Sequence, residues 1–172
     1  YAYENGVIVV AAGGQVIDVV TYPGKFSRTI GVGGVRRDRQ AWFKYDRIWL
    51  DRIDVWGPAD DVWRANTTLD NDIEKYRYGD GDGTSYATVH VAGAAAMWLV
   101  ARGRDIEGKY SELWQRAEAF RKLVKKTHQP VMGSYKPAEG TGILDIKALI
   151  EADLPTLRKQ DFRKQEAAGE IF

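Results

Sequence analysis

The sequence predicts an α/β domain with a mostly parallel sheet, and three observations lead to this prediction. Residues 7–12 form a continuous run of Val, Ile and Ala between glycines, which is typical of a strand buried on both faces. A second apolar run, residues 29–35, follows the turn at residues 22–24. Residues 86–102 have no polar face in a helical projection, and a helix that is apolar all round is buried.

The composition excludes several classes of protein. The chain has 172 residues, 25 Lys and Arg, 24 Asp and Glu, a formal charge of +1 and no cysteine. A charge near zero argues against a nucleic-acid partner. Without cysteine there is no disulfide framework, zinc–thiolate cluster or catalytic thiol. No apolar run approaches the roughly 20 residues of a membrane-spanning helix, so we expect neither a nucleic acid nor a membrane as partner.

Three further elements complete the predicted order. Residues 53–56 form a short strand that ends at Gly57-Pro58. Residues 111–126 carry an apolar stripe at helical spacing, with Ser111 as N-cap and lysines in the last turn, where the helix dipole favours them. Residues 140–150 form a final turn and short helix, which Leu154-Pro155 ends.

Two segments lack apolar periodicity. Residues 60–82 are polar and rich in Asn, Asp and Gly, which predicts a long surface loop. Its acidic runs begin like calcium-binding loops but lack the glutamate at the twelfth position, so we expect no metal site there. Arg36, Arg37 and Arg39 form a small basic cluster, which we interpret as a solvated turn.

The two ends of the sequence lead to predictions about processing of the chain and about the bounds of the domain. A buried strand begins within a few residues of Tyr1, which is not a methionine, so we expect a fragment or a processed chain. The residues after Leu154-Pro155 alternate in charge without an apolar stripe. We therefore place one domain over residues 1–153 and a charged tail or docking segment over residues 154–172.

Ser85 stands where the long apolar helix begins. A helix N-terminus offers unpaired backbone N–H groups and a partial positive charge, which stabilise an oxyanion formed when a serine attacks a carbonyl. The preceding glycines let a substrate backbone approach closely. The alternative is that Ser85 is only the N-cap of the helix, which is one of the commonest roles of serine.

Residues 83–93, GTSYATVHVAG, closely resemble the nucleophile signature of the subtilisin-like serine peptidases, Gly-Thr-Ser-x-Ala-(Thr/Ser)-Pro-His-Val-Ala-Gly. Ten of the eleven positions match, and Val89 replaces the usual proline. Four further segments resemble family landmarks in the family's order, at residues 6–15, 22–33, 54–58 and 140–145. The resemblance implies a subtilisin-like three-layer α/β fold, of which this chain holds the C-terminal part, and serine-type endopeptidase chemistry.

The resemblance also implies roles for individual residues. Ser85 matches the nucleophile, and Thr84 matches a residue whose hydroxyl supports the oxyanion site. Gln15 falls where the family has its oxyanion-hole Asn; it keeps the amide donor but is one methylene longer. The alternative is that Gln15 is an ordinary loop residue after the strand. One wall of the pocket for the residue before the scissile bond is matched by Ala12, Gly13 and Gly14.

The base that a serine nucleophile needs is missing from this pattern. His90 follows Ser85 by five residues, which is about 140° around a helix and about 7.5 Å along it, so we expect a structural role. The family's Asp and His lie upstream of the strand at residues 7–12, and neither position exists in this sequence. We therefore expect the chain to need the missing N-terminal half of the catalytic domain as a partner and to be inactive alone.

Two functional hypotheses remain open. The first is part of an endopeptidase that cleaves peptide or protein substrates, with no cofactor and no metal. The second is a catalytically dead module that keeps the peptide groove, which the substitutions at Gln15 and Val89 would also fit. The resemblance favours a secreted protein, although the composition does not fix a compartment.

Overall fold

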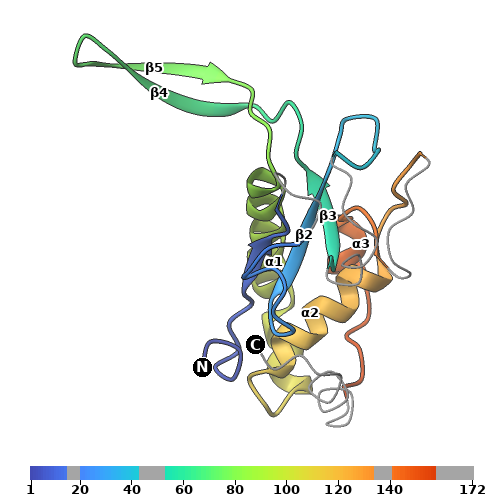
Figure 1. Cartoon of the computed structure of the whole chain (residues 1–172). Coiled ribbons are helices and arrows are strands. Elements are labelled where there is room, and N and C mark those ends of the chain that lie inside the picture. Colours follow the sequence, from blue (N-terminus) through green and yellow to red (C-terminus); the bar gives the residue numbers. More distant parts are fainter. Residues whose placement is uncertain (15–19, 43–52, 134–140, 158–172) are drawn as a thin grey trace.

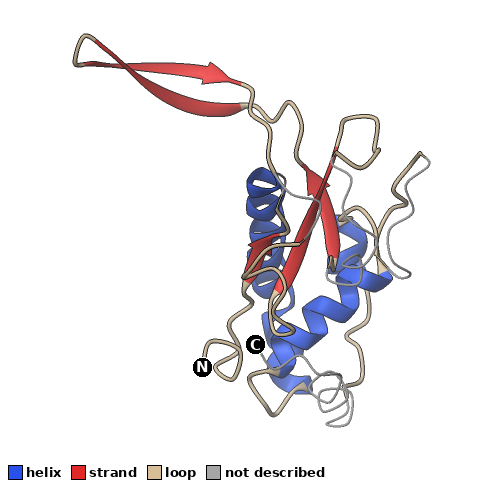
Figure 2. Cartoon of the chain, in the orientation of Figure 1, coloured by secondary structure: helices blue, strands red, loops and turns tan. Residues whose placement is uncertain are grey.

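The computed structural model describes residues 1–14, 20–42, 53–133 and 141–157 (Figure 1). Strands β1 (Val10–Ala12), β2 (Ile30–Val35) and β3 (Val55–Pro58) pair side by side in that order, and both pairs are parallel. The helices are α1 (Thr84–Lys109), α2 (Gln115–Lys126) and α3 (Ile146–Glu151) (Figure 2). The fold is therefore α/β with a parallel sheet, as the sequence predicts.

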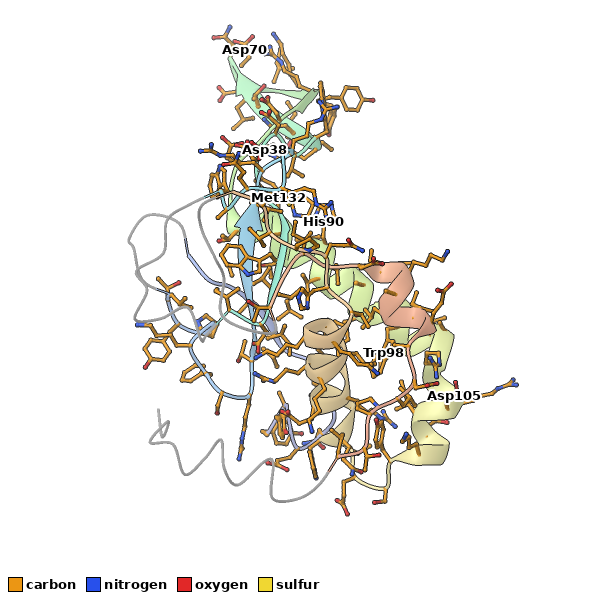
Figure 3. All side chains as sticks on the ribbon, turned by 90° about the vertical axis from the view of Figure 1, so that its right-hand side faces the viewer. Asp38, Asp70, His90, Trp98, Asp105 and Met132 are labelled. Carbon is orange, nitrogen blue, oxygen red and sulfur yellow. The ribbon has the colours of Figure 1, made fainter. Side chains whose placement is uncertain are left out.

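The central strands alternate between two hydrophobic cores. Ile30, Val32 and Val55 belong to the larger core, together with the inner face of α1 and most of the buried side chains of α2. Trp98 of α1, labelled in Figure 3, meets the ring of Phe120 in this core at 5.7 Å between centroids. Val35 and Trp56 belong to the smaller core on the other side of the sheet. Burial on both faces explains why these short strands are almost wholly apolar.

Glycines in β2 and β3 allow close packing where the strands end. A Cβ at Gly34 would lie 2.5 Å from the Cβ of Ala59 and 3.4 Å from Cγ2 of Thr84. A Cβ at Gly57 would lie 3.2 Å from the Cβ of Ala87. The absence of these side chains lets the first turn of α1 lie directly against the carboxyl ends of the strands.

Strand β1 is shorter and less buried than predicted. Residues 7–12 were expected to be buried on both faces, but pairing with β2 begins where Ile30 donates to the carbonyl of Val9, and Val7 is 50% exposed. Among the described strands β1 lies at the edge of the sheet, with β2 as its neighbour. A strand with one described neighbour is less enclosed than a central one, which explains the exposure.

Within residues 60–82, residues 64–79 form a β-hairpin, so the prediction of a long loop is wrong. Strands β4 (Arg64–Asp70) and β5 (Ile73–Gly79) pair antiparallel over their whole length and extend away from the body as an arm (Figure 1). The turn between them contains Asn71 and Asp72, whose φ angles are 50° and 63°. Positive φ at both central residues is the requirement of a tight two-residue hairpin turn, and Asn and Asp tolerate it.

Helix α1 is longer and less buried than predicted. It continues past Gly103 to Lys109, because Arg102 donates to the carbonyls of Ile150 and Ala152 and Ile106 is buried in the core. These contacts offset the helix-weakening effect of the glycines, about 1 kcal/mol each. The prediction of burial all round is wrong, because one side is exposed. We call this side the outer face; it consists of Val89, Ala92, Gly93, Ala96, Met97 and Val100.

Helix α2 begins at Gln115, so Ser111 is not its N-cap. The residues before it are held by the N-terminal segment: Trp114 stacks on Tyr3, and Gly6 lies so close to the Leu113 carbonyl that a Cβ there would be 2.9 Å from its oxygen. These tertiary contacts replace the capping that local sequence predicts.

A buried charged network joins α2 to the start of β3. Asp54 accepts from the backbone of Gly31 and lies 3.3 Å from the Arg121 guanidinium and 2.9 Å from Nζ of Lys125. Burial lowers the pKa of Arg121, but the nearby carboxylates of Asp54 and Glu118 raise it by a larger amount. The pKa of Arg121 is therefore raised above its ordinary value. The network thus holds a permanent cation beneath the sheet and fixes α2 against it.

The segment after α3 docks on the end of α1. Tyr110 donates to the carbonyl of Pro155 and Lys109 to that of Leu154, whose side chain is buried. Burial raises the pKa of Tyr110 to about 12. No helix within the described ranges is long and apolar enough to cross a membrane.

Candidate active site

Ser85 lies at the exposed N-terminal end of α1, at the carboxyl ends of the strands. The N-cap is Gly83, whose backbone N–H donates to the carbonyl of Ala59 at 2.7 Å, and no side chain caps the helix. The N–H of Tyr86 donates back to Gly83 at 3.1 Å. The alternative of Ser85 as N-cap is therefore wrong, and Ser85 is the second residue of the helix.

The hydroxyl and the backbone N–H of Ser85 are both available to a ligand. Neither has a hydrogen-bond partner within the part of the chain that the structure describes, and the residue is exposed. The first N–H groups of a helix have no intrahelical acceptor and carry the positive end of its dipole. An oxyanion next to Ser85 would lie in this field.

The end of β1 approaches the start of α1. The Thr84 hydroxyl lies 3.4 Å from the carbonyl oxygen of Gly14 and donates to it, and Thr84 is buried. Gly13 donates to the carbonyl of Val32 at 2.8 Å, which keeps the chain beside β2 beyond the strand's end. Gly14 has φ of 103°, a conformation that L side chains rarely adopt. The structure thus brings Thr84, Ser85 and residues 12–14 together.

The comparisons with known proteins show the family of this chain. The model of the subtilase family, a peptidase family, matches residues 1–147. The chain belongs to the subtilase family. It is 29% identical over 135 residues to an intracellular serine protease of Paenibacillus polymyxa, and 37% identical over 107 residues to a thermophilic serine proteinase of Bacillus sp. strain AK1. These matches cover 78% and 61% of this chain but only 36% and 24% of the two relatives.

The solved structures show the same fold. Fervidolysin from Fervidobacterium pennivorans, a keratinolytic enzyme related to subtilisin, superposes with a TM-score of 0.67 at 22% identity. That match covers 91% of this chain and 24% of fervidolysin. The observed sheet and helices are thus those of the subtilisin fold, and this chain spans a quarter to about a third of the proteins named here.

Gln15 lies outside the described residues, so its amide is not placed. Its neighbours Ala12, Gly13 and Gly14 are described and are partly or fully buried. A Cβ at Gly24 would lie 2.9 Å from the carbonyl oxygen of Ala12, so the segment after Val20 packs directly on this stretch. The backbone of residues 12–14 is therefore held from both sides at the mouth of the site.

Both histidines of the chain are engaged away from Ser85. Nδ1 of His90 lies 2.8 Å from the carbonyl oxygen of Tyr86, one turn earlier in α1, and the exposed ring is labelled in Figure 3. Nδ1 of His128 lies 3.0 Å from the carbonyl oxygen of Lys125 at the end of α2. Each ring thus satisfies a helix carbonyl, and neither is hydrogen-bonded to the Ser85 hydroxyl.

Asp82, the acidic residue closest to Ser85 in the sequence, stabilises the root of the hairpin. A carboxylate oxygen of Asp82 accepts from the backbone N–H of Asp61 at 3.0 Å. Val62 and Gly81 exchange two backbone hydrogen bonds, of 3.0 and 3.1 Å. The loop that leads into Ser85 is therefore fixed by hydrogen bonds on both of its strands.

Sequence reasoning missed the outer face of α1. Its residues follow Ser85 at spacings of three and four, so Ser85 and this apolar surface share one side of the helix. The signal was present in the sequence, because residues 85, 89, 92, 96 and 100 fall on one helical stripe. It was hidden because the opposite side of the helix is equally apolar.

Proposed function

We propose that this chain carries the nucleophile of a serine-type endopeptidase, with Ser85 as the attacking residue. The observation that carries the proposal is the position of Ser85: an exposed hydroxyl without a described partner, in the first turn of α1, beside the glycine end of β1. Membership of the subtilase family supports the same assignment.

The proposed reaction is acyl transfer. Oγ of Ser85 bonds to the carbonyl carbon of the scissile peptide as its proton passes to a general base, and the carbonyl oxygen becomes an oxyanion. The tetrahedral intermediate collapses as the base protonates the leaving amine, which leaves an acyl-enzyme. Water, deprotonated by the same base, then releases the carboxylic acid and regenerates Ser85.

The oxyanion and substrate positions follow from the elements around Ser85. The Ser85 N–H and the amide of Gln15 are the proposed oxyanion donors, and Thr84 positions the Gly14 backbone through its hydroxyl. Residues 12–14 form the proposed wall for the side chain before the scissile bond. Loss of one oxyanion donor lowers kcat by about 100- to 1,000-fold in such sites.

We propose that the base and its carboxylate come from a polypeptide that covers the outer face of α1. The outer face is exposed and apolar, with Val89 70%, Met97 52% and Val100 87% accessible. Large contiguous apolar patches on a protein surface mark interaction sites. A polypeptide that packs on this face lies on the side of the helix that carries Ser85. It is either an N-terminal half joined to Tyr1 or a separate chain.

A fluorophosphonate probe followed by intact-mass analysis tests the proposal. The protein is used as the assembly of this chain with the polypeptide on the outer face, and the mass spectrum reports both components. We expect one probe molecule on Ser85 and none in Ser85→Ala. Ser111→Ala, which removes an exposed serine outside the site, is the matched control and should label fully.

A catalytically dead peptide-binding module is the second candidate, and Val89 in place of the motif's proline favours it. It predicts an assembly that binds peptides yet takes up no probe at Ser85. That outcome would contradict the peptidase assignment.

A further inference from the structure

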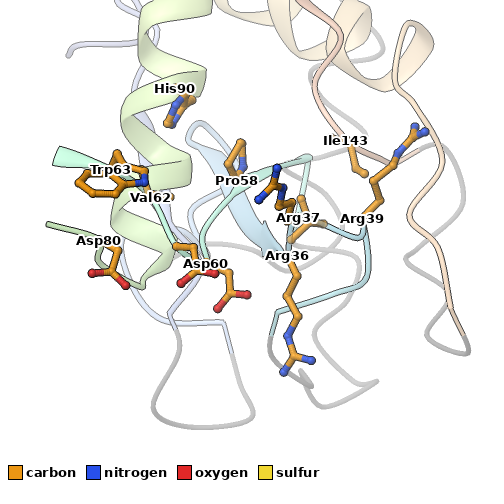
Figure 4. Close-up of a pocket in the computed structure, with 12 residues that line it drawn as sticks. Arg36, Arg37, Arg39, Pro58, Asp60, Val62, Trp63, Asp80, His90 and Ile143 are labelled. Carbon is orange, nitrogen blue, oxygen red and sulfur yellow. The ribbon is translucent and has the colours of Figure 1, made fainter.

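A cavity of about 810 Å³ opens beside the root of the hairpin (Figure 4). Its walls come from the turn after β2, the segment between β3 and β4, and the second turn of α1. Ligand sites commonly have volumes of about 300 to 1,000 Å³, so the cavity is large enough for a few residues of a peptide. Ser85 does not line it.

Charges of opposite sign line opposite sides of this cavity. Figure 4 shows Trp63 and Asp80 on one side, Arg37 and Arg39 on the other, and Pro58 between them. The side chains of Arg37, Asp60 and Asp80 make no ion pair or hydrogen bond with any residue in the described ranges. Arg39 makes one long hydrogen bond, of 3.4 Å, to Gln129. The sequence-based interpretation of the arginines as a solvated turn is therefore incomplete, because they also form a cavity wall.

The two sides suit two different groups of one ligand. Trp63 is 76% exposed, and an indole face next to carboxylates attracts a lysine or arginine side chain through cation–π and ionic contacts. Arg37 and Arg39 offer planar guanidinium groups, which pair with carboxylates. Pro58, which lies between the two sides, and Val62, which lies beside Trp63, suit the aliphatic parts of a peptide (Figure 4).

The cavity is tied to the loop that carries Ser85. Asp80 precedes Ser85 by five residues, which limits their Cα separation to about 18 Å. The reciprocal hydrogen bonds between Val62 and Gly81 hold the cavity wall and this loop together. An extended substrate of about five residues spans this distance, so one polypeptide can occupy both places.

We propose that this cavity is an exosite that binds a mixed-charge segment of the polypeptide substrate, remote from the scissile bond. The basic side chain of the segment lies against Trp63, Asp60 and Asp80, and its acidic side chain pairs with Arg37 and Arg39. This inference rests on the proposed function for the identity of the ligand, but binding at the exosite does not need the Ser85 hydroxyl.

Fluorescence anisotropy tests the exosite. The probes are fluorescein-labelled decapeptides of Gly, Ser and Ala that contain one Lys and one Glu separated by two, four or six residues. Each probe has versions with Lys→Gln, with Glu→Gln and with both. The protein is the 172-residue chain as wild type, Ser85→Ala, Asp80→Asn and Arg37→Gln. Arg104→Gln and Asp153→Asn, both exposed and outside the cavity, are the matched controls.

We expect one spacing to bind best, and loss of its Lys to weaken binding to the wild-type chain about threefold, the size of an exposed ion pair. The same loss should have a clearly smaller effect on binding to Asp80→Asn, because one of the two carboxylates that face the Lys is already gone. Arg37→Gln should behave in the same way toward the Glu of the probe. Ser85→Ala and both control variants should bind like the wild type.

Each pair of changes, one in the probe and one in the protein, forms a double-mutant cycle. Equal binding of the neutral and charged probes, or additive losses in these cycles, would overturn the exosite. Asp80 and Arg37 are exposed, so their variants should unfold at the wild-type temperature, and a melting curve checks this. Failure of the cycles with intact fluorophosphonate labelling of Ser85 would remove the exosite and leave the peptidase assignment. Non-additive losses in the cycles without labelling of Ser85 would support the exosite and remove the peptidase assignment.

Discussion

The inner and outer faces of α1 have similar compositions but different surroundings. The inner face, with Ala87, Val91, Ala94 and Trp98, is buried against the sheet and α2. The outer face is also made of Ala, Val, Met and Gly, yet it is exposed over the described chain. Apolar surface stabilises a fold only when it is removed from water. The inner face therefore stabilises this chain and the outer face does not.

The difference between the two faces indicates that they have different roles at the site. Ser85 lies on the same side of α1 as the outer face, and the elements that hold α1 pack on the inner face. The inner face therefore fixes the position of Ser85, the proposed nucleophile, and the proposed polypeptide on the outer face would supply the groups next to it. Predictions about the two faces separate these two tasks.

The largest expected effect is on the inner face. Trp98 is fully buried and packs against Phe120, so Trp98→Ala should lower the free energy of unfolding by about 3–5 kcal/mol. Val100→Ala, two residues away on the outer face, should change it by less than about 0.5 kcal/mol. Urea denaturation measures both. Equal losses would show that the outer face is already packed in this chain.

The next effect is on association. The exposed outer face and the edge strand β1 predict that the isolated 172-residue chain self-associates. Met97→Glu combined with Val100→Glu should weaken this association at least tenfold in sedimentation experiments, because a charge on the patch must be desolvated. Glu107→Gln, exposed at the far end of α1, is the control. A wild-type chain that stays monomeric would contradict the prediction.

The smallest effect concerns α3, which contributes Leu149 to the core that the inner face of α1 shares. Asp145 caps α3 by accepting from the N–H of Ala148 at 2.9 Å, and this bond, together with one from Gln129, lowers its pKa. Asp145→Ala should cost about 0.5–1 kcal/mol at neutral pH.

The pH dependence of this cost has a definite sign. A lowered pKa in the folded chain means that the carboxylate stabilises the fold above its unfolded pKa of about 3.9 and loses this contribution as the pH falls through the folded value. The gap in melting temperature between wild type and Asp145→Ala should therefore close on acidification from about pH 4 downward. A gap that persists in strong acid would assign the effect to packing.

The sequence was informative where burial or motif dictates structure. β2 and β3 are apolar because both faces of the sheet are covered, and the start of α1 follows from the motif around Ser85. The hairpin was missed because β4 and β5 contribute no side chain to the hydrophobic cores of the described residues, so they carry no apolar alternation of the usual kind. Its local signal was Asn71-Asp72, a turn pair that favours positive φ.

The remaining errors come from tertiary contacts. Ser111 is a good N-cap residue, but Trp114 and Leu113 pack on the N-terminal segment and shift the start of α2. The exosite arginines and aspartates lie far apart in sequence, so composition alone could not place them on one cavity. The exposure of the outer face could not be predicted from the sequence, because periodicity does not distinguish two apolar sides of one helix.

The most direct test of the central claim is fluorophosphonate labelling of the assembled protein after a charge is placed on the outer face. Val100 lies fifteen residues beyond Ser85, about 22 Å along the helix, so Val100→Glu leaves the chemistry at Ser85 untouched. If the outer face takes up the base-bearing polypeptide, this variant should lose labelling at Ser85, and excess of that polypeptide should recover it. Labelling at the wild-type rate in Val100→Glu would contradict the account.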